Sequence, residues 1–125
     1  MIINKSSAQN NFYSLEVHIN GLKSNKGKVL LKLSDNKNKL TNKKSAKINN
    51  KSCTLIFINL KEGKYLFSYF HDENSNNKLD SNWLGIPSEG YGFSNNALSK
   101  FGYPSIKDRL FIINKNTTIT LTISY

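Results

Sequence analysis

Apolar and polar residues alternate with a period of two along several stretches of this chain, and no window of useful length shows the 3.6-residue period of a helix. In residues 12–19, every second side chain from Tyr13 onward is apolar, while His18 falls on the opposite, solvent-facing side. This alternation predicts an all-β fold in which one face of each strand packs into a core.

The same pattern predicts about seven strands, at 12–19, 28–34, 45–48, 52–60, 65–71, 110–113 and 117–125. We expect the first two strands to form a hairpin across 21–27, and 114–116 to join the last two as a pair. This count favours a two-sheet antiparallel Greek-key sandwich. Residues 12–125 would be one domain, and 1–11 a segment that is disordered or was introduced during cloning.

Residues 72–108 do not follow the alternation, and they contain both prolines and four of the seven glycines. Long irregular loops in compact domains are usually functional or disordered. The many aromatic residues in this segment favour an ordered loop that packs onto the sandwich.

The net charge of +10 comes almost entirely from lysine, because Arg109 is the only arginine among 18 basic residues. Base readout and bidentate phosphate recognition favour arginine. We therefore expect no nucleic-acid partner. No apolar run approaches the roughly 20 residues of a membrane helix, so no membrane span is expected. The single cysteine, Cys53, excludes an internal disulfide and is predicted to lie in the core.

Three blocks of sequence, 61–65, 71–74 and 84–96, together with Gly102, Pro104 and the closing strand, resemble the domain of unknown function 2141 family. The resemblance implies a secreted or periplasmic bacterial β-sandwich of the transthyretin-like type, without an established activity. The family usually has the stretch Asp-x-Asn-Gly-Asn-Gly, in which Ser75 and Asn77 replace the glycines here. Residues 7–9, Ser-Ala-Gln, look like a signal cleavage junction, so we expect a mature chain whose signal peptide is absent from this sequence.

The segment 72–80 places oxygen atoms at the offsets of a calcium-binding EF-hand loop. Asn77 stands at the sharp-turn position that glycine normally occupies, and Asn tolerates the left-handed backbone conformation there. Trp83 replaces the acid expected at the twelfth position, so Glu89 would have to supply that carboxylate. The predicted calcium ligands are Asp72, Asn74, Asn76, the Lys78 carbonyl, Asp80 and Glu89.

So few formal negative charges predict weak binding, with a dissociation constant of roughly 10⁻⁴ to 10⁻³ M, as in extracellular calcium modules. The alternative interpretation of the same residues is a loop rich in Asx turns that needs no ion.

Our leading functional expectation is a non-enzymatic extracytoplasmic module whose long loop presents a binding surface to a cell-surface protein or glycan. Aromatic residues of this loop would either stack on sugar rings or close one end of the sandwich: Trp83, Tyr91, Phe93, Phe101 and Tyr103. The alternative is a hydrolase or glycan-processing enzyme that uses His71 with Glu73 or Glu89. We find no nucleophile motif and no second histidine or cysteine spaced to complete a metal site with His71.

Overall fold

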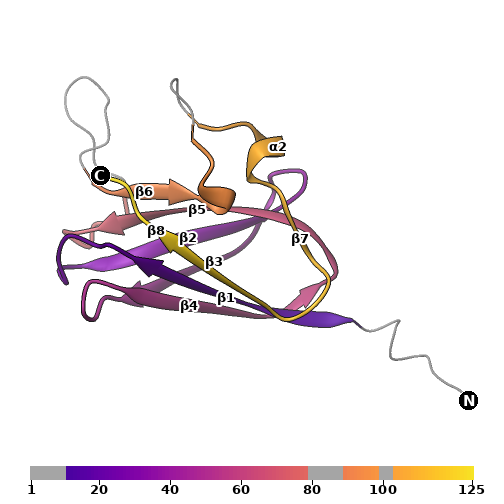
Figure 1. Ribbon diagram of the computed structural model, residues 1–125, viewed down its shortest axis with the longest axis horizontal. Coiled ribbons are helices and arrows are strands. Elements are labelled where there is room, and N and C mark those ends of the chain that lie inside the picture. The colour runs from indigo at the N-terminus through magenta and orange to yellow at the C-terminus, as the bar shows by residue number, and fades with distance from the viewer. Residues whose placement is uncertain (1–10, 79–88, 99–102) are drawn as a thin grey trace, which may run out of the picture.

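The computed structural model describes residues 11–78, 89–98 and 103–125. Within these ranges the chain is mostly β, as the alternation predicts (Figure 1). The elements are β1 (Phe12–Asn20), β2 (Lys28–Asp35), β3 (Leu40–Lys47), β4 (Cys53–Lys61), β5 (Gly63–Asp72), β6 (Tyr91–Phe93), the 3-10 helix η1 (Ser94–Asn96), the short helix α2 (Ile106–Arg109), β7 (Phe111–Ile113) and β8 (Thr117–Thr122). The predicted ligand Asp80, the aromatic residues Trp83 and Phe101, and residues 1–10 lie outside the described ranges.

The strands form two sheets in a sandwich-like arrangement, and the two sheets overlap in the view of Figure 1. The three-stranded sheet has the order β4-β1-β8. The five-stranded sheet has the order β3-β2-β5-β6, and β7 also pairs with β5. The described residues thus form eight strands rather than about seven.

The expected hairpin between the first two strands is wrong, because β1 and β2 lie in different sheets. The connection between them is not a surface turn. Leu22, inside it, is buried in the core, and its backbone N–H donates to the Lys51 carbonyl at 3.1 Å. Because Leu22 packs into the core, the chain passes from the sheet of β1 to the sheet of β2 instead of turning back in the same sheet.

The expected pairing of the last two strands is also wrong, since β7 pairs with β5 while β8 pairs with β1. The β1–β8 pair is parallel, from Leu15 opposite Thr117 to Asn20 opposite Thr122, so the sandwich is not purely antiparallel. Alternation predicts which face of a strand is buried, but it carries no information about strand direction.

β3 is longer than the edge strand predicted at 45–48. It begins at Leu40, in a lysine- and asparagine-rich stretch that has no apolar alternation. It pairs antiparallel with β2, from Lys28 opposite Lys47 to Ser34 opposite Leu40. Most of its side chains are exposed, so it shows no apolar alternation. Lysine side chains on such an edge generally discourage pairing with other chains.

Residues 72–108 are not one irregular loop, because their described part contains β6, η1 and α2. β6 pairs with β5, and the Ser94 hydroxyl ties this segment to the sandwich. It accepts a hydrogen bond from the Phe67 backbone at 3.0 Å and donates to the Arg109 carbonyl at 2.6 Å. Elements of three or four residues are too short to produce a recognisable period.

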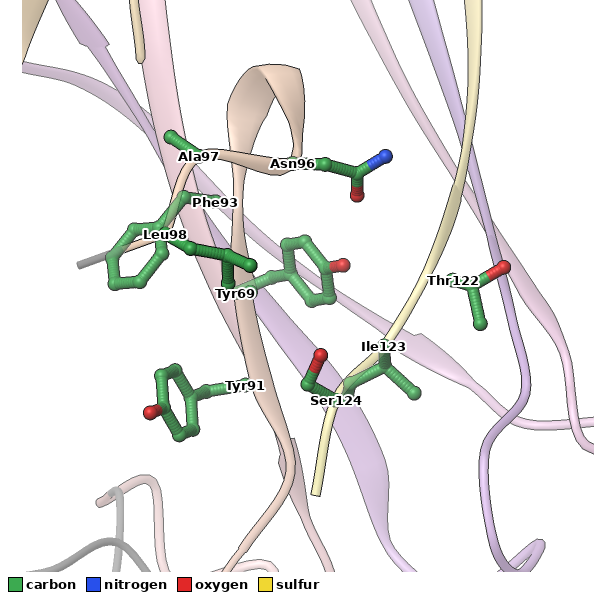
Figure 2. Close-up of a pocket in the computed structure, with 10 residues that line it drawn as sticks. Tyr69, Tyr91, Phe93, Asn96, Ala97, Leu98, Thr122, Ile123 and Ser124 are labelled. Carbon is green, nitrogen blue, oxygen red and sulfur yellow. The ribbon is translucent and has the colours of Figure 1, made fainter. Parts of the chain in front are cut away.

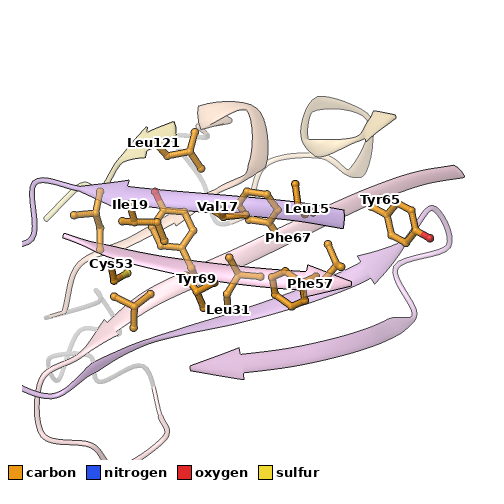
Figure 3. Packing of buried hydrophobic residues seen from close by; sticks show 14 of the residues in the cluster. Leu15, Val17, Ile19, Leu31, Cys53, Phe57, Tyr65, Phe67, Tyr69 and Leu121 are labelled. Carbon is orange, nitrogen blue, oxygen red and sulfur yellow. The ribbon is translucent and has the colours of Figure 1, made fainter. Parts of the chain in front are cut away.

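The core lies between the two sheets and is built from the inward-facing side chains of both (Figure 3). Leu15, Val17 and Ile19 of β1 are fully buried, as the alternation predicts. Cys53 is a buried free cysteine, and burial raises the pKa of its thiol to about 11. The thiol is therefore protonated at neutral pH and behaves as a small apolar core residue.

None of the helices among the described residues has the length and apolar character needed to cross a membrane.

Candidate metal centre

Asp72 is the last residue of β5, and its side chain organises the loop that follows. It is fully buried. Its Oδ1 accepts a hydrogen bond from the Asn76 backbone at 3.1 Å, and its Oδ2 accepts one from Asn77 at 2.7 Å. The Ser75 backbone N–H donates to the Asp72 carbonyl at 3.2 Å. The two carboxylate bonds and the carbonyl bond therefore curve the loop around Asp72, which is itself the first predicted calcium ligand.

The loop turns sharply at Ser75 and Asn77, whose φ angles are +56° and +65°. Both residues are in the left-handed region that glycine adopts without steric cost. The left-handed geometry predicted for Asn77 is confirmed. Ser75 and Asn77, which replace the glycines of the Asp-x-Asn-Gly-Asn-Gly pattern, therefore adopt the left-handed backbone conformation that glycine would adopt.

Asn74, Asn76 and Lys78 lie on the exposed rim of the loop. The Asn74 Oδ1 accepts from the Asn76 N–H at 3.3 Å, and the Asn76 Oδ1 accepts from the Lys78 N–H at 2.9 Å. These bonds are those of successive Asx turns.

Glu89 returns to this loop from the following segment, as the missing twelfth-position acid requires. It is only 6% exposed, and its Oε2 accepts a hydrogen bond from the Glu73 backbone N–H at 2.9 Å. Glu73 is the neighbour of Asp72 in the chain. Two buried carboxylates therefore flank the first peptide units of the loop.

Lysine side chains border the loop but make no ion pair with Asp72 among the described residues. Lys28 Nζ donates to the Asn77 Oδ1 at 2.6 Å, and Lys23 Nζ lies 3.8 Å from the Glu73 carboxylate. In the same ranges, no three His, Cys, Asp or Glu side chains gather as metal ligands would. The side chains of this loop offer carboxylate and amide oxygens, which are the ligand types that hard cations prefer.

Gly27, in the turn before β2, touches the loop from the other side. Its φ is +70°, and a Cβ at this position would overlap the Asp72 carbonyl and the backbone of Glu73. Glycine therefore allows two backbone segments, 45 residues apart, to come into direct contact. Sequence reasoning missed this residue, because only the β2–β5 pairing, with Lys28 opposite Asp72, brings the two together.

His71 is fully buried, and both of its ring nitrogens are engaged. Nε2 lies 2.7 Å from the Lys26 carbonyl, which can only accept, so Nε2 carries a proton. Nδ1 lies 2.6 Å from the Tyr125 hydroxyl, and that hydroxyl also accepts from the Lys23 N–H at 3.0 Å. With Nδ1 accepting from the Tyr125 hydroxyl, all of these groups have hydrogen-bond partners. Tyr125 lies 54 residues from His71 in sequence, and no sequence signal indicates this contact.

The described aromatic residues of the segment pack against one another. The Phe93 ring makes edge-to-face contacts with Tyr91 at 6.0 Å and with Tyr103 at 5.1 Å between centroids. The buried Arg109 guanidinium lies 5.8 Å from the Phe93 ring centre and 5.7 Å from that of Tyr103. Phe93 is therefore buried within this cluster, while Tyr103 remains largely exposed.

Replacing Ser75 with glycine tests the strained turn. At a positive φ, removing the Cβ relieves steric strain that exceeds the added entropy of the unfolded chain, so we expect Ser75→Gly to stabilise the protein by about 0.5–1 kcal/mol. Urea denaturation measures the change. Ser24→Gly, at a half-buried position that lacks a positive φ, is the control; it relieves no strain and loses the hydrogen bond from the Lys26 N–H, so it should not stabilise the protein. Equal or lower stability of Ser75→Gly would contradict the left-handed turn.

Comparison with known families gives a match between residues 17–120 and the family model described as "Uncharacterized protein conserved in bacteria (DUF2141)". No curated protein and no solved structure shows a significant match to the chain. The matched range includes the whole candidate metal centre.

Proposed function

We propose that this chain, which belongs to the DUF2141 family, is a non-enzymatic module that acts outside the cytoplasm and whose loop after β5 is ordered by calcium. The observation that carries the proposal is the buried Asp72 carboxylate, which makes two backbone hydrogen bonds but no ion pair among the described residues. Burying a charged carboxylate is costly, and a bound cation offsets that cost.

The proposed ligands are oxygen atoms of Asp72, Asn74, Asn76, Lys78, Asp80 and Glu89. Calcium takes six to eight such oxygens in a flexible geometry. The bound ion would supply charge compensation and would hold the loop against the sheet. Lys28 and Lys23 at the border of the loop oppose cation binding, which supports a weak site with a dissociation constant of roughly 10⁻⁴ to 10⁻³ M.

A site of this affinity is useful where calcium is abundant, which supports a secreted or periplasmic location. The ordered loop would help to present a surface to a cell-surface protein or glycan. The finer fold class is proposed on two grounds: the number of strands favours a Greek-key sandwich, and the family resemblance implies the transthyretin-like type.

The alternative, a hydrolase or glycan-processing enzyme that uses His71 with Glu73 or Glu89, has less support. Both nitrogens of the buried His71 ring are bonded, to Lys26 and Tyr125. A general base must reach the proton that it abstracts, and this ring is directed into the protein instead.

Calcium should raise the melting temperature of the metal-stripped protein. An ion that binds only the folded state adds about 1.4 kcal/mol at ten times its dissociation constant. For a domain of this size, this corresponds to roughly 3–7 °C. Differential scanning fluorimetry with about 10 mM calcium, a concentration chosen from the expected affinity, measures the shift. Magnesium should produce a smaller one, because it demands tighter octahedral coordination. Equal shifts with both ions would indicate a nonspecific salt effect and contradict the proposal.

A further inference from the structure

A pocket lies between β6 and η1 on one side and the end of β8 on the other (Figure 2). Its volume is about 350 Å³. This lies at the lower end of the range for small-molecule sites. Its wall includes Tyr69, Tyr91, Phe93, Asn96 and Ser124.

The Tyr69 hydroxyl is the most informative group in this pocket. Tyr69 is only 2% exposed, yet its hydroxyl makes no hydrogen bond with the part of the chain that the structure describes. Tyr65 behaves differently, since its hydroxyl donates to the Lys61 carbonyl at 2.6 Å. A buried tyrosine hydroxyl usually has a partner. The Tyr69 hydroxyl therefore lacks a polar atom that a ligand could supply.

The backbone makes room for this hydroxyl at Gly92, where a Cβ would overlap the end of the Tyr69 ring. Burial raises the pKa of Tyr69 to about 12, so the group remains a hydrogen-bond donor at neutral pH. In Figure 2 the hydroxyl end of the ring points toward β8, with the Asn96 amide on one side of it and the Ser124 hydroxyl on the other.

The pocket differs from the rest of this basic protein, because no described residue that lines it carries a charge. The polar groups are hydroxyls and one amide, and the remaining wall consists of the Tyr91 and Phe93 rings with aliphatic side chains. A charged ligand would find no opposite charge here. A purely apolar ligand would leave the Tyr69 hydroxyl without a partner in a dry site.

We propose that this pocket binds a neutral, hydroxyl-bearing ring of monosaccharide size, with the Tyr69 hydroxyl as its central hydrogen-bonding group. The ring hydroxyls would bond Tyr69, Asn96 and Ser124, and the apolar face of the sugar would pack on the aromatic wall. The inference rests on the proposed role as a binding module and names the ligand class, but it does not depend on calcium.

The test is ligand-observed NMR titration of the protein with the methyl glycosides of glucose, galactose, mannose and N-acetylglucosamine. At least one should bind saturably. Tyr69→Phe should weaken that binding at least tenfold, because a site that hydrogen-bonds a ligand loses affinity when the donor is removed. Asn96→Ala, at an exposed position, should weaken it as well. Tyr65→Phe, which changes a tyrosine outside the pocket, should leave it unchanged.

Melting temperatures separate a binding role of the Tyr69 hydroxyl from a structural one. Without sugar, Tyr69→Phe should be as stable as the wild type, because it loses no hydrogen bond, whereas Tyr65→Phe should melt lower. Absence of saturable binding for all four glycosides would overturn the inference. Full binding by Tyr69→Phe, or equal binding of cyclohexane carboxylate, would do the same. All titrations are run with and without calcium, so that failure here and failure of the calcium proposal are distinguishable.

Discussion

Gly27→Ala should be among the most destabilising single substitutions outside the core, and it should disturb the loop after β5. The added Cβ would overlap the Asp72 carbonyl and the Glu73 backbone, neither of which can move aside as a flexible side chain could. Alanine must also adopt a φ near +70°. Left-handed strain and overpacking together cost about 2–5 kcal/mol. The melting temperature should therefore fall by roughly 10 °C or more, measured by circular dichroism.

Gly21→Ala is the matched control, because Gly21 has a similar φ of +78°. A Cβ there meets only the Thr122 methyl group, at 2.9 Å, which is the end of a side chain. The free energy of unfolding of this variant should fall only by the cost of the left-handed backbone, about 1–2 kcal/mol. If both variants are equally destabilised, the close approach between Gly27 and Asp72 does not contribute, and the account of the loop's anchorage is wrong.

Asp72→Asn should abolish the calcium-induced rise in melting temperature. The substitution keeps the shape of the side chain and one acceptor oxygen but removes the formal charge. An amide nitrogen also replaces one of the oxygens that accept from Asn76 and Asn77. We expect the metal-free variant to be about 1–3 kcal/mol less stable than the wild type, because a part-buried, charge-assisted backbone hydrogen bond is lost. Scanning fluorimetry with and without calcium measures both effects.

Asp35→Asn is the control that separates an ion site from a simple Asx turn. The Asp35 Oδ1 also accepts two backbone hydrogen bonds, from Lys37 and Lys39, both at 2.9 Å. These bonds lower the pKa of Asp35, but no buried carboxylate corresponding to Glu89 accompanies it in the described residues. The Asp35→Asn protein should keep the full calcium response. Loss of the response in this variant too would show that it does not arise from the Asp72 loop.

The period of two identified the strands and their buried faces well, because side-chain direction is a local property of a strand. Leu15, Val17 and Ile19 are buried as predicted. Strand neighbours could not be predicted in this way. β1 lies between β4 and β8, and its parallel pairing with β8 joins residues about 100 positions apart. The hairpin expected between the first two strands does not form, because the buried Leu22 lies in a connection that crosses from one sheet to the other.

The features of the candidate metal centre that depend on residues close together in the sequence could be predicted. The offsets within 72–78 predicted the left-handed turn at Asn77, and the structure confirms it. They predicted Asp72 as a calcium ligand, and the structure shows its carboxylate accepting hydrogen bonds from the loop backbone. Glu89 was found through the acid missing from the loop, and it does return to the loop. Gly27 and Tyr125 could not be found, because they approach only through the pairing of β2 with β5 and through the contact with His71.

Calorimetric titration of calcium into the metal-stripped protein tests the central claim most directly. We predict saturable binding of one ion with a dissociation constant of roughly 10⁻⁴ to 10⁻³ M, present in the Asp35→Asn variant and absent in Asp72→Asn. If the wild-type protein shows no heat of binding and no change in melting temperature at millimolar calcium, the loop is a scaffold of Asx turns and the proposed ion site does not exist.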